Sequence, residues 1–469
     1  MALTMAPATM LTGSPYRVLN PATGEITQSY PSATDHEIES ALRCAHGASR
    51  RERIRSAADR TDELLRVAVL LRERALLLAS IIAEEMGKPV AQGISEVEYS
   101  ADIFEYYARN APRLTADESI PSSASGRAVL QKRPLGPLVG IMPWNYPYYQ
   151  VARFAAPNLA LGNTVLVKPS EWCPRSAIAL EELLTEAGVP EGAYQSVLAT
   201  HDQVRMMIAD ARVQGVSLTG SDRAGSAVAA IAGEHLKKVV LELGGSDAYV
   251  ILDTESVEDA AATAWAVRME NMGQACNSNK RIIVAQHIFD EFVTEVVQLA
   301  SRLRPGDPLH LSDAEYPPLA ARSAAFHLEE VVADAVSKGA TLHAGGQVLD
   351  GRGAYFSPAV LTGVTPDMRA YREELFGPVA VVYCAIDDED ALRLANDTEY
   401  GLGAAIFSAD AARAARFAKN LEVGMVSINA ASAERAEFPF GGVKRSGFGR
   451  ELGPLGIDEF VNRRLVYVA

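Results

Sequence analysis

The sequence predicts an α/β protein built from two parallel-sheet domains. Its 469 residues are too many for one hydrophobic core, which indicates at least two domains. Short apolar runs alternate with helical patterns along most of the chain. Strands covered by helices on both faces are apolar on both sides, and these runs are almost continuously apolar. Length, alternation and apolar runs together predict parallel sheets lying between layers of helices.

The first predicted domain contains four apolar runs that each end in polar or glycine residues. Helical spacing over 35–87, which stops at Gly87, and over 91–110 predicts helices ahead of this sheet, and 17–30 is typical of a hairpin. We therefore predict a cofactor-binding domain made of residues 1–112 and 135–246. The four runs are GPLVGIMPWN (136–145), NTVLVKPSE (163–171), VQGVSLTGS (213–221) and KKVVLELGG (237–245).

A second α/β domain is predicted over residues 247–445, because the alternation of strand and helix restarts after Gly245. Helical patterns at 257–270 and near 288–303 alternate with apolar runs. The predicted strands are 247–253, 280–285, 378–386, 404–409 and 425–430.

Two segments do not fit either domain. Residues 115–127 (TADESIPSSASGR) are polar, and the last residues, 463–469 (RRLVYVA), form a strand with no obvious partner nearby. We expect 113–134 and 446–469 to form a small β oligomerisation element. An unpaired strand can join the sheet of a neighbouring subunit, which predicts a homodimer or a homotetramer.

Composition argues against several classes of function. A net charge of −15 argues against nucleic-acid binding, and no apolar run is long enough to predict a membrane span. Residues 1–15 do not resemble a secretory signal, and we expect either a short mobile tail or extra residues ahead of a later start such as Met5 or Met10. The four separated cysteines include no C-x-x-C pair, so we expect a reducing, cytoplasmic setting, no disulfides and no metal site. We interpret Cys44, Cys173 and Cys384 as structural.

Polar side chains follow each strand of the first predicted sheet, where ligands of open α/β sheets bind. They are Asn145, Lys168 with Glu171, Ser221 after Gly220, and Glu242. The loop TGSDRAG (219–225) suits a phosphate at a helix start, although it lacks the ending of a Walker A loop. The stretch GFGRELG (447–453) does not match a dinucleotide fingerprint. Glycine spacing alone therefore does not establish a nucleotide site.

A set of motifs in a fixed order resembles the NAD(P)-dependent aldehyde dehydrogenase superfamily, from about residue 16 to the end. The resemblance is nearest to the bacterial succinate-semialdehyde dehydrogenase branch, through LELGGSD and FGGVKRSGFGREL. It implies two Rossmann-like parallel α/β domains, one for cofactor binding and one for catalysis. The motifs are PWNYP (143–147), VKPSE (167–171), TGS (219–221), LELGG (241–245), GQAC (273–276), EELFGPV (373–379) and PFGGVKRSGFGRELG (439–453).

The resemblance implies that Cys276 is a nucleophile. A thiolate that attacks an aldehyde carbon needs small, polar and accessible surroundings, such as Gly273 and Ser278 provide. The Asn145 amide and the Cys276 N–H would stabilise the oxyanion of the thiohemiacetal. Glu242 would act as general base for hydrolysis of the thioester that remains after hydride transfer.

The cofactor contacts implied by the resemblance cover the whole dinucleotide. Lys168 and Glu171 would bind the adenosine ribose, Ser221 the pyrophosphate, and Glu374 the nicotinamide ribose. Glu171 would repel a 2′-phosphate, so NAD is favoured and NADP remains possible. Leu218 replaces a usual aromatic, and 198–204 lacks a usual glycine. The full predicted set is Ile141, Trp144, Lys168, Ser170, Glu171, Gly220, Ser221, Leu243, Glu374 and Phe376.

The resemblance also implies a substrate tunnel lined by residues after PWN. An arginine at the position of Arg153 binds the distal carboxylate in succinate-semialdehyde dehydrogenases, as a guanidinium fork does. A second arginine of some of those enzymes is Glu270 here, so we name Arg435 as the second contact. The predicted substrate residues are Tyr146, Tyr149, Arg153, Arg435 and Phe440. Succinic semialdehyde is therefore predicted, with an aromatic or broad range of aldehydes as the alternative.

Two other classes of function stay open on the residues alone. A cysteine hydrolase or acyltransferase would use Cys276 and Glu242 without a nicotinamide cofactor. A non-catalytic binding protein on the same scaffold would need none of the motif residues for activity. The presence of Cys276, Glu242 and Asn145 together argues against the second class.

Overall fold

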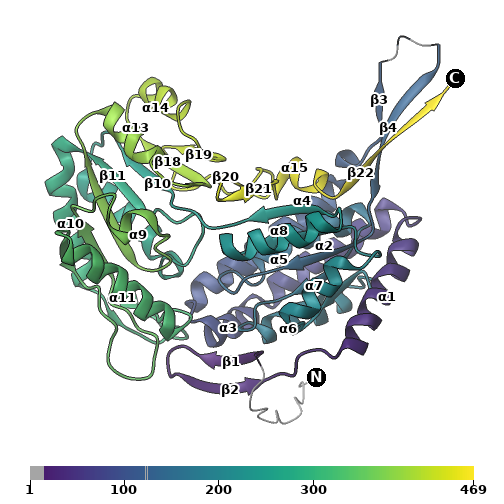
Figure 1. The fold of residues 1–469 in the computed structure, drawn as a ribbon, viewed down its shortest axis with the longest axis horizontal. Helices are drawn as coiled ribbons and strands as arrows, with labels where there is room; N and C mark the ends of the chain where they lie inside the picture. Colours follow the sequence, from purple (N-terminus) through teal and green to yellow (C-terminus); the bar gives the residue numbers. More distant parts are fainter. Residues whose placement is uncertain (1–14, 122, 124) are drawn as a thin grey trace.

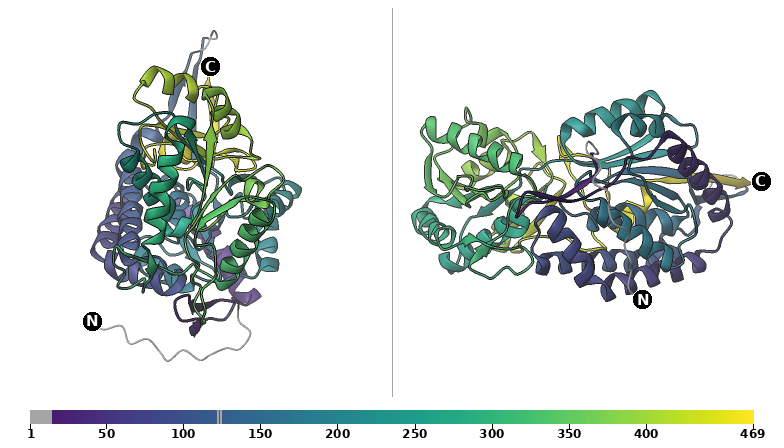
Figure 2. Two further views of the ribbon diagram at one scale, coloured as in Figure 1. Left: turned by 90° about the vertical axis from the view of Figure 1, so that its left-hand side faces the viewer. Right: turned by 90° about the horizontal axis from the view of Figure 1, so that it is seen from below.

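The computed structural model describes residues 15–121, 123 and 125–469. The prediction that the N-terminus carries no secretory signal concerns residues 1–14, which lie outside the described residues. Two α/β lobes lie side by side, and a thin β arm projects from the larger lobe next to the C-terminus (Figure 1). The two turned views in Figure 2 show the same lobes and the same projecting arm. The predicted two-domain α/β class is confirmed.

The strands have the following bounds. They are β1 (Arg17–Asn20), β2 (Glu25–Ser29), β3 (Glu118–Ile120), β4 (Arg127–Pro134), β5 (Pro137–Ile141), β6 (Thr164–Lys168), β7 (Tyr194–Ser196), β8 (Gly215–Thr219), β9 (Lys238–Glu242), β10 (Ala248–Ile251), β11 (Arg281–Ala285), β12 (Arg304–Pro305), β13 (Glu315–Tyr316), β14 (Thr341–Ala344), β15 (Ala359–Thr362), β16 (Val379–Ala385), β17 (Tyr400–Gly401), β18 (Gly403–Phe407), β19 (Met425–Ile428), β20 (Val443–Lys444), β21 (Gly447–Phe448) and β22 (Val461–Val468).

The helices have the following bounds. They are α1 (Asp35–Glu52), α2 (Ala57–Glu73), α3 (Ala75–Met86), α4 (Val90–Leu114), α5 (Tyr149–Leu161), α6 (Pro174–Glu186), α7 (His201–Ala209), α8 (Asp222–Glu234), α9 (Val257–Met269), α10 (Phe289–Ser301), α11 (Arg322–Ser337), α12 (Arg369–Arg372), α13 (Asp388–Asn396), α14 (Ala411–Ala418) and α15 (Gly453–Asp458), with the short 3-10 turns η1 (Glu270–Gly273) and η2 (Gln286–Ile288).

The larger lobe contains a six-stranded sheet in the order β21-β9-β8-β5-β6-β7. Strands β5 to β9 are parallel, and every residue of β6 and β8 is buried. Side chains of alternate strand positions enter two different cores, because successive residues of a strand point to opposite faces. Leu138 and Val165 pack with α4, α5 and α6, whereas Val139 and Leu166 pack with α1, α7 and α8. Helices therefore cover both faces, as the apolar runs predict.

The smaller lobe contains a seven-stranded sheet in the order β14-β15-β16-β11-β10-β18-β19. Only β14 is antiparallel to its neighbour. Tyr249 and Ile282 pack with α9 and α10 on one face, and Val250 and Ile283 pack with α11, α13 and α14 on the other. The predicted strands of the second domain are all present in this sheet.

Five residues connect the two sheets. β9 ends at Glu242 and β10 begins at Ala248, so only 243–247 separate the carboxyl end of one strand from the amino end of the next. The carboxyl edge of the first sheet therefore faces the amino edge of the second. Groups that follow β5, β6, β8 and β9 come together with groups that precede β10, β11, β16 and β18.

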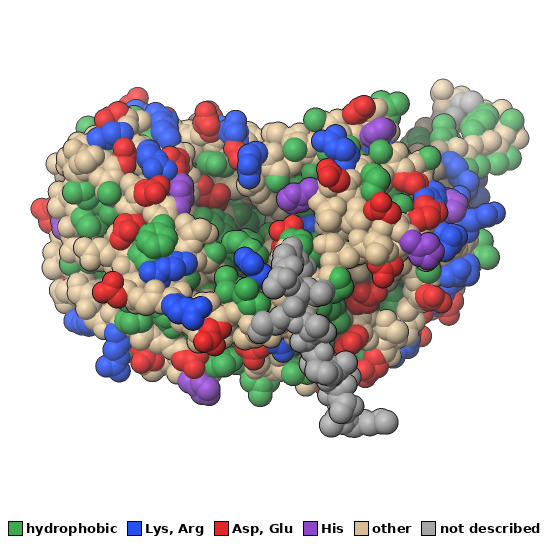
Figure 3. All heavy atoms as spheres, turned by 60° about the horizontal axis from the view of Figure 1, so that its bottom comes forward, with side chains coloured by type: hydrophobic (Ala, Val, Ile, Leu, Met, Phe, Trp, Pro, Cys, Tyr) green, Lys and Arg blue, Asp and Glu red, His purple; other side chains and the backbone are tan. Residues whose placement is uncertain are grey.

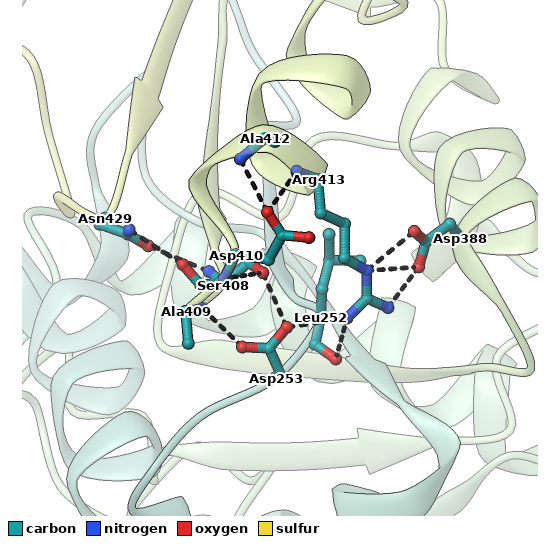
Figure 4. Close-up of polar contacts among 9 residues, drawn as sticks. All are labelled: Leu252, Asp253, Asp388, Ser408, Ala409, Asp410, Ala412, Arg413 and Asn429. Atoms are coloured by element: carbon teal, nitrogen blue, oxygen red, sulfur yellow. Dashed lines mark hydrogen bonds and ion pairs between the residues drawn. The ribbon is translucent and has the colours of Figure 1, made fainter.

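The carboxyl edge of the second sheet is occupied by ion pairs (Figure 4). Arg413 of α14 lies 2.7 Å from Asp253, which follows β10, and it also pairs with Asp388 at the start of α13. Ser408, which follows β18, donates its hydroxyl to Asp253 at 2.7 Å. These contacts hold the strand ends against the helices that follow them, so the charged residues at this edge stabilise the fold.

The arm is a three-stranded antiparallel sheet in the order β22-β4-β3. The C-terminal strand pairs along its whole length with β4, from Val461 opposite Pro134 to Val468 opposite Arg127. The expectation of an unpaired terminal strand is therefore wrong: its partner is 327 or more residues earlier in the chain, beyond the reach of local pattern. Residues 447–448 pair with β9 in the six-stranded sheet instead, so only the part from Val461 onward belongs to the arm.

None of the helices in the described ranges is both long enough and apolar enough to cross a membrane.

Candidate active site

Cys276 lies on a cavity of about 430 Å³ between the lobes. Its walls come from α4, the start of α5, the turn at 270, residues 275–278 and the loop near 432. Figure 3 shows a hollow with hydrophobic side chains in its wall on one face of the molecule. The predicted tunnel residues Tyr146, Tyr149 and Phe440 line the same cavity as Cys276.

The backbone in front of the nucleophile is held in an uncommon conformation. Asn271, Met272 and Gly273 have φ values of 46°, 54° and 70°, three left-handed residues in succession. Met272 has no short polar side chain to favour that region, so the surrounding contacts must impose it. The Gln274 side chain holds this segment in two ways. Its Nε2 donates to the Asn271 carbonyl at 3.0 Å, and its Oε1 accepts the N–H of the distant Ala320 at 2.9 Å.

Asn145 reaches the nucleophile loop from the end of β5. It is 4% exposed, and its Nδ2 donates to the Gln274 carbonyl at 3.0 Å. Asn271 Nδ2 donates back to the Asn145 carbonyl at 3.0 Å. An amide nitrogen carries two protons, so one remains for a group on the cavity side. The structure thus places a side-chain donor beside the loop of Cys276.

Burial raises the pKa of the Cys276 thiol to about 12, while Arg153 and Lys280 act to lower it. The sulfur is half-buried rather than freely exposed, so the free protein holds a thiol at neutral pH. This differs from the accessible thiolate expected for a small polar loop. The loop residues are small and polar, but the helices α4 and α5 and the aromatic cavity wall remove water from them.

Glu242 ends β9 in a fully buried position. Burial and the neighbouring Glu451 carboxylate raise its pKa well above the usual range, and Arg153 acts in the opposite direction. Neither carboxyl oxygen has a hydrogen-bond partner among the described residues. Burial without partners favours the neutral carboxyl, and a carboxylate formed in such a place is a stronger base than one in water.

The two glycines after Glu242 are required by close approach. A Cβ on Gly245 would lie closer than 3.0 Å to the Cys276 carbonyl oxygen, and a Cβ on Gly244 would meet Glu374 at a similar distance. The Gly245 N–H also donates to Glu374 Oε1 at 3.0 Å. The motif LELGG therefore brings the base, the nucleophile loop and Glu374 together, because no other residue permits these contacts.

The predicted dinucleotide contacts lie along the carboxyl edge of the six-stranded sheet. Ile141, Lys168 and Leu243 stand at or next to the ends of β5, β6 and β9, and Ser170 with Glu171 follows β6. Gly220 and Ser221 lead into α8, where the Ser221 hydroxyl accepts the Ala224 N–H as the N-cap. The rings of Trp144 and Phe376 meet edge to face at 5.7 Å between centroids.

These residues fit a dinucleotide on observations that are independent of any motif. A Cβ on Gly220 would meet only the Leu218 side chain, at 3.6 Å, so no protein contact requires glycine there. A phosphate that binds backbone N–H groups at a helix start does require such an approach. The buried Thr219 hydroxyl beside it has no partner among the described residues.

The adenosine end of this edge carries both signs of charge. Lys168 Nζ lies 3.6 Å and His201 Nε2 lies 3.7 Å from Glu171 Oε1. Burial lowers the pKa of Lys168, and Glu171 acts to raise it. His201 was not among the predicted residues, because it starts α7 and meets Glu171 only through the fold.

Neither predicted substrate arginine reaches the cavity wall in this conformation. The Arg153 side chain is fully buried, 2.7 Å from the Glu451 carboxylate through Nε and bonded to Gln150. Its guanidinium lies over the Tyr149 and Phe440 rings, behind the cavity wall. Arg435 is exposed and borders a separate hollow with Glu437 outside the Cys276 cavity.

The charged side chains that do line the cavity are carboxylates: Glu96, Glu270 and Glu434. Glu434 accepts the Tyr149 hydroxyl at 2.7 Å, and Glu270 accepts that of Tyr146 at 3.3 Å. Burial and Glu434 raise the pKa of Glu270. Local pattern could not assign Glu96 and Glu434 to this cavity, because they lie about 180 residues before and 160 residues after Cys276.

With this geometry established, comparison with known proteins identifies the class. The chain belongs to the aldehyde dehydrogenase family, whose family model matches residues 10–466. It is an aldehyde dehydrogenase, and its cofactor is a nicotinamide dinucleotide.

The chain is similar to individual members of this family along nearly its whole length. The chain is 49% identical over 452 residues to a succinate-semialdehyde dehydrogenase [NADP(+)] of Deinococcus radiodurans, covering 96% of this chain and 94% of the relative. It is 40% identical to one of Mycobacterium avium, with 97% of each chain covered. It is also similar to the crystal structure of a Streptococcus pyogenes succinic semialdehyde dehydrogenase with NADP+, with a TM-score of 0.93, 37% identity, and 97% of this chain and 99% of that chain covered.

Gly245 provides a test of the close approach at the nucleophile. We predict that Gly245→Ala lowers kcat at least about 100-fold, because a methyl group at that Cβ displaces the Cys276 carbonyl, and displacement of about 1 Å at a reacting group has that effect. Steady-state kinetics measure it. Gly233→Ala is the control, because an added Cβ there has no neighbour within 4 Å. It should leave kcat unchanged and stabilise the fold by about 0.5–1 kcal/mol; equal kcat values for the two variants would contradict the account.

Proposed function

We propose that Cys276 carries the oxidation of an aldehyde to a carboxylic acid. The observation that supports this most directly is the position of Cys276 on the inter-lobe cavity. Asn145 binds the loop of Cys276, and Gly245, three residues after Glu242, lies against the Cys276 carbonyl. The thiol first gives its proton to water in the cavity, and the resulting thiolate adds to the aldehyde carbon. The carbonyl oxygen becomes an oxyanion that the Asn145 amide and the Cys276 N–H stabilise. The bound nicotinamide dinucleotide supplies the hydride acceptor.

Glu242 acts in the second half of the reaction. The thioester on Cys276 is hydrolysed by a water molecule that gives one proton to Glu242, and the sulfur leaves as the acid is released. A raised pKa suits this step, because a carboxylate that holds its proton tightly is a stronger base. The neighbouring Glu451 carboxyl and the Arg153 guanidinium set how tightly that proton is held.

Succinic semialdehyde is the substrate that we propose. The relatives whose names include this substrate cover nearly the whole chain, and Arg153 occupies the position implied by the resemblance. Arg153 donates to the Gln150 side-chain oxygen, and Gln150 itself lines the cavity. In this conformation a substrate carboxylate would meet Gln150, with Arg153 acting through it.

An uncharged, aromatic or aliphatic aldehyde is the second candidate. The specific observation in its favour is the cavity lining. Tyrosine and phenylalanine rings accompany carboxylates there, and none of the described lining residues is a lysine or an arginine. Glu270 and Glu434 would oppose a substrate carboxylate by charge repulsion.

A substrate screen separates the two candidates. We predict that kcat/KM is higher for succinic semialdehyde than for butyraldehyde or benzaldehyde. The absorbance of the reduced cofactor measures each rate.

Variants of the cavity test the same assignment. Glu270→Gln should lower KM for succinic semialdehyde about threefold or more and leave KM for butyraldehyde unchanged, because one opposing charge is removed. Arg153→Ala should raise KM selectively for the carboxylated substrate, and it should lower kcat for all three aldehydes because the same guanidinium acts on Cys276 and Glu242. Cys276→Ser should abolish turnover of all three; activity that survives it would remove the proposed chemistry.

We propose that the enzyme accepts both dinucleotides and that Glu171 sets their ratio. The names of the relatives favour NADP, whereas the Glu171 carboxylate at the adenosine ribose favours NAD. Lys168 and His201 beside Glu171 offset part of its charge and support binding of a 2′-phosphate.

Replacing Glu171 tests this arrangement. We predict that Glu171→Gln raises kcat/KM for NADP about tenfold and changes that for NAD little, because the amide keeps a hydrogen-bonding oxygen and loses the charge that repels the phosphate. Glu182→Gln, on the exposed side of α6, is the matched control and should change neither value. An unchanged NADP/NAD ratio in Glu171→Gln would show that the charge does not discriminate.

We propose that the arm joins two subunits. β22 is paired with β4 on one side and lies at the edge of its sheet, so its other edge is open. Leu465, Tyr467 and Val468 expose 60%, 47% and 61% of their surface, an apolar group typical of an interface. An open strand edge with apolar side chains suits addition to the sheet of a second copy.

Truncation of the arm tests assembly. We predict that a chain ending at Asn462 elutes at the mass of one subunit in light scattering, whereas the full chain elutes as a dimer or tetramer. Leu465→Asp should weaken assembly in the same direction. Leu236→Asp is the control, because Leu236 is 94% exposed on the larger lobe away from the arm. A truncated chain with the mass of the full assembly would exclude this interface.

A further inference from the structure

Lys280 is a buried cation directly behind the nucleophile loop. Its side chain is 1% exposed, although lysine is among the residues least often buried. The ammonium donates to the Ala275 carbonyl at 2.7 Å and to the Cys276 carbonyl at 2.6 Å. It also lies 2.9 Å from Glu374 Oε1. An ammonium has three protons, and these three acceptors match them in number.

The contact with Ala275 controls the direction of a catalytic donor. The Ala275 carbonyl and the Cys276 N–H belong to one peptide group, which is planar and trans. In a trans peptide the N–H points opposite to the C=O. An ammonium that binds the carbonyl on one side therefore fixes the N–H on the other side, where the oxyanion on Cys276 forms. No hydrogen bond from this N–H to a described residue is found, so the donor is available.

The other two contacts connect the loop with the cofactor edge. Glu374 binds the Gly245 N–H and Lys280 with the same oxygen, Oε1. Its second oxygen, Oε2, lies against Gly244. One buried lysine thus joins the peptide of the nucleophile to the carboxylate predicted to bind the nicotinamide ribose.

We propose that Lys280 is a positioning residue that orients the Ala275–Cys276 peptide as the backbone half of the oxyanion hole and holds Glu374 for the cofactor. The inference rests on the proposed role of Cys276. Removing the lysine leaves only the Ser278 N–H, at 3.3 Å, on the Ala275 carbonyl, so the Cys276 N–H is held less firmly toward the oxyanion. Nothing in the proposal requires Lys280 to touch the substrate.

The test compares two reactions of the same sulfur in Lys280→Met. Oxidation of the aldehyde forms an oxyanion, whereas alkylation of Cys276 by iodoacetamide displaces iodide and forms none. We expect kcat to fall about 100-fold, the usual effect of losing one oxyanion donor. Alkylation at pH 8 should fall less than about tenfold, through loss of the nearby positive charge. KM for the dinucleotide should rise several-fold as Glu374 loses its partner.

Two further variants keep the result interpretable. Arg281→Lys perturbs the adjacent buried cation, which binds the Ser246, Leu394 and Ala395 carbonyls away from Cys276. It should lower the melting temperature and change the rates of turnover and of Cys276 alkylation by the same factor. Lys280→Arg serves if Lys280→Met does not fold, because a planar guanidinium cannot direct its protons from one nitrogen to three acceptors. It should lower kcat about tenfold.

Equal losses of alkylation and turnover would overturn the inference, because they would show only that the sulfur has moved. A kcat within threefold of the parent in whichever Lys280 variant folds would overturn it as well. Turnover that survives Cys276→Ser would instead remove the proposed function, so the two failures are distinguishable.

Discussion

The contact between the Gly244–Gly245 backbone and the groups around Cys276 is the constraint on which the rest of the site depends. Five residues connect β9 with β10, and this short connection keeps the carboxyl edge of one sheet close to the amino edge of the other. A side chain at either glycine would separate the nucleophile loop from Glu374. The connection that follows β9, the Cys276 loop before β11 and Glu374 before β16 are neighbours because those glycines allow it.

Local pattern predicts most of this fold because its strands are buried on both faces. A strand that packs against helices on both sides, such as β6 or β8, is apolar at every position and is visible in the sequence. The partner of β22 is not visible, since the pairing with β4 joins segments far apart in the chain and is decided by the whole fold. The positions of polar residues at strand ends are likewise predictable, since Asn145 follows β5 and Glu242 ends β9, whereas their chemical roles stay predictions.

The sequence predicts much less about which charged side chains are buried and which partners they bind. Arg153 follows the PWN motif and is predicted to face the substrate, yet its guanidinium pairs with Glu451 behind the aromatic wall. Lys280 has nothing in its local pattern that distinguishes it from a surface lysine, and its three acceptors come from a loop and from a segment almost 100 residues away. The cavity carboxylates Glu96 and Glu434 are also brought in by distant elements. Burial and pairing of charges depend on long-range packing, which periodicity does not encode.

The buried charges around Cys276 form a balanced set rather than a general positive field. Burial favours the neutral thiol on Cys276 and the neutral carboxyl on Glu242, whereas Arg153 acts on both toward the charged form. In the reaction that we propose, the two groups act in turn, the sulfur in attack and the carboxyl in hydrolysis, and Arg153 favours the charged form of each. A charge that a substrate, a cofactor or water brings near either group changes its ionisation strongly, because buried surroundings have a low dielectric constant.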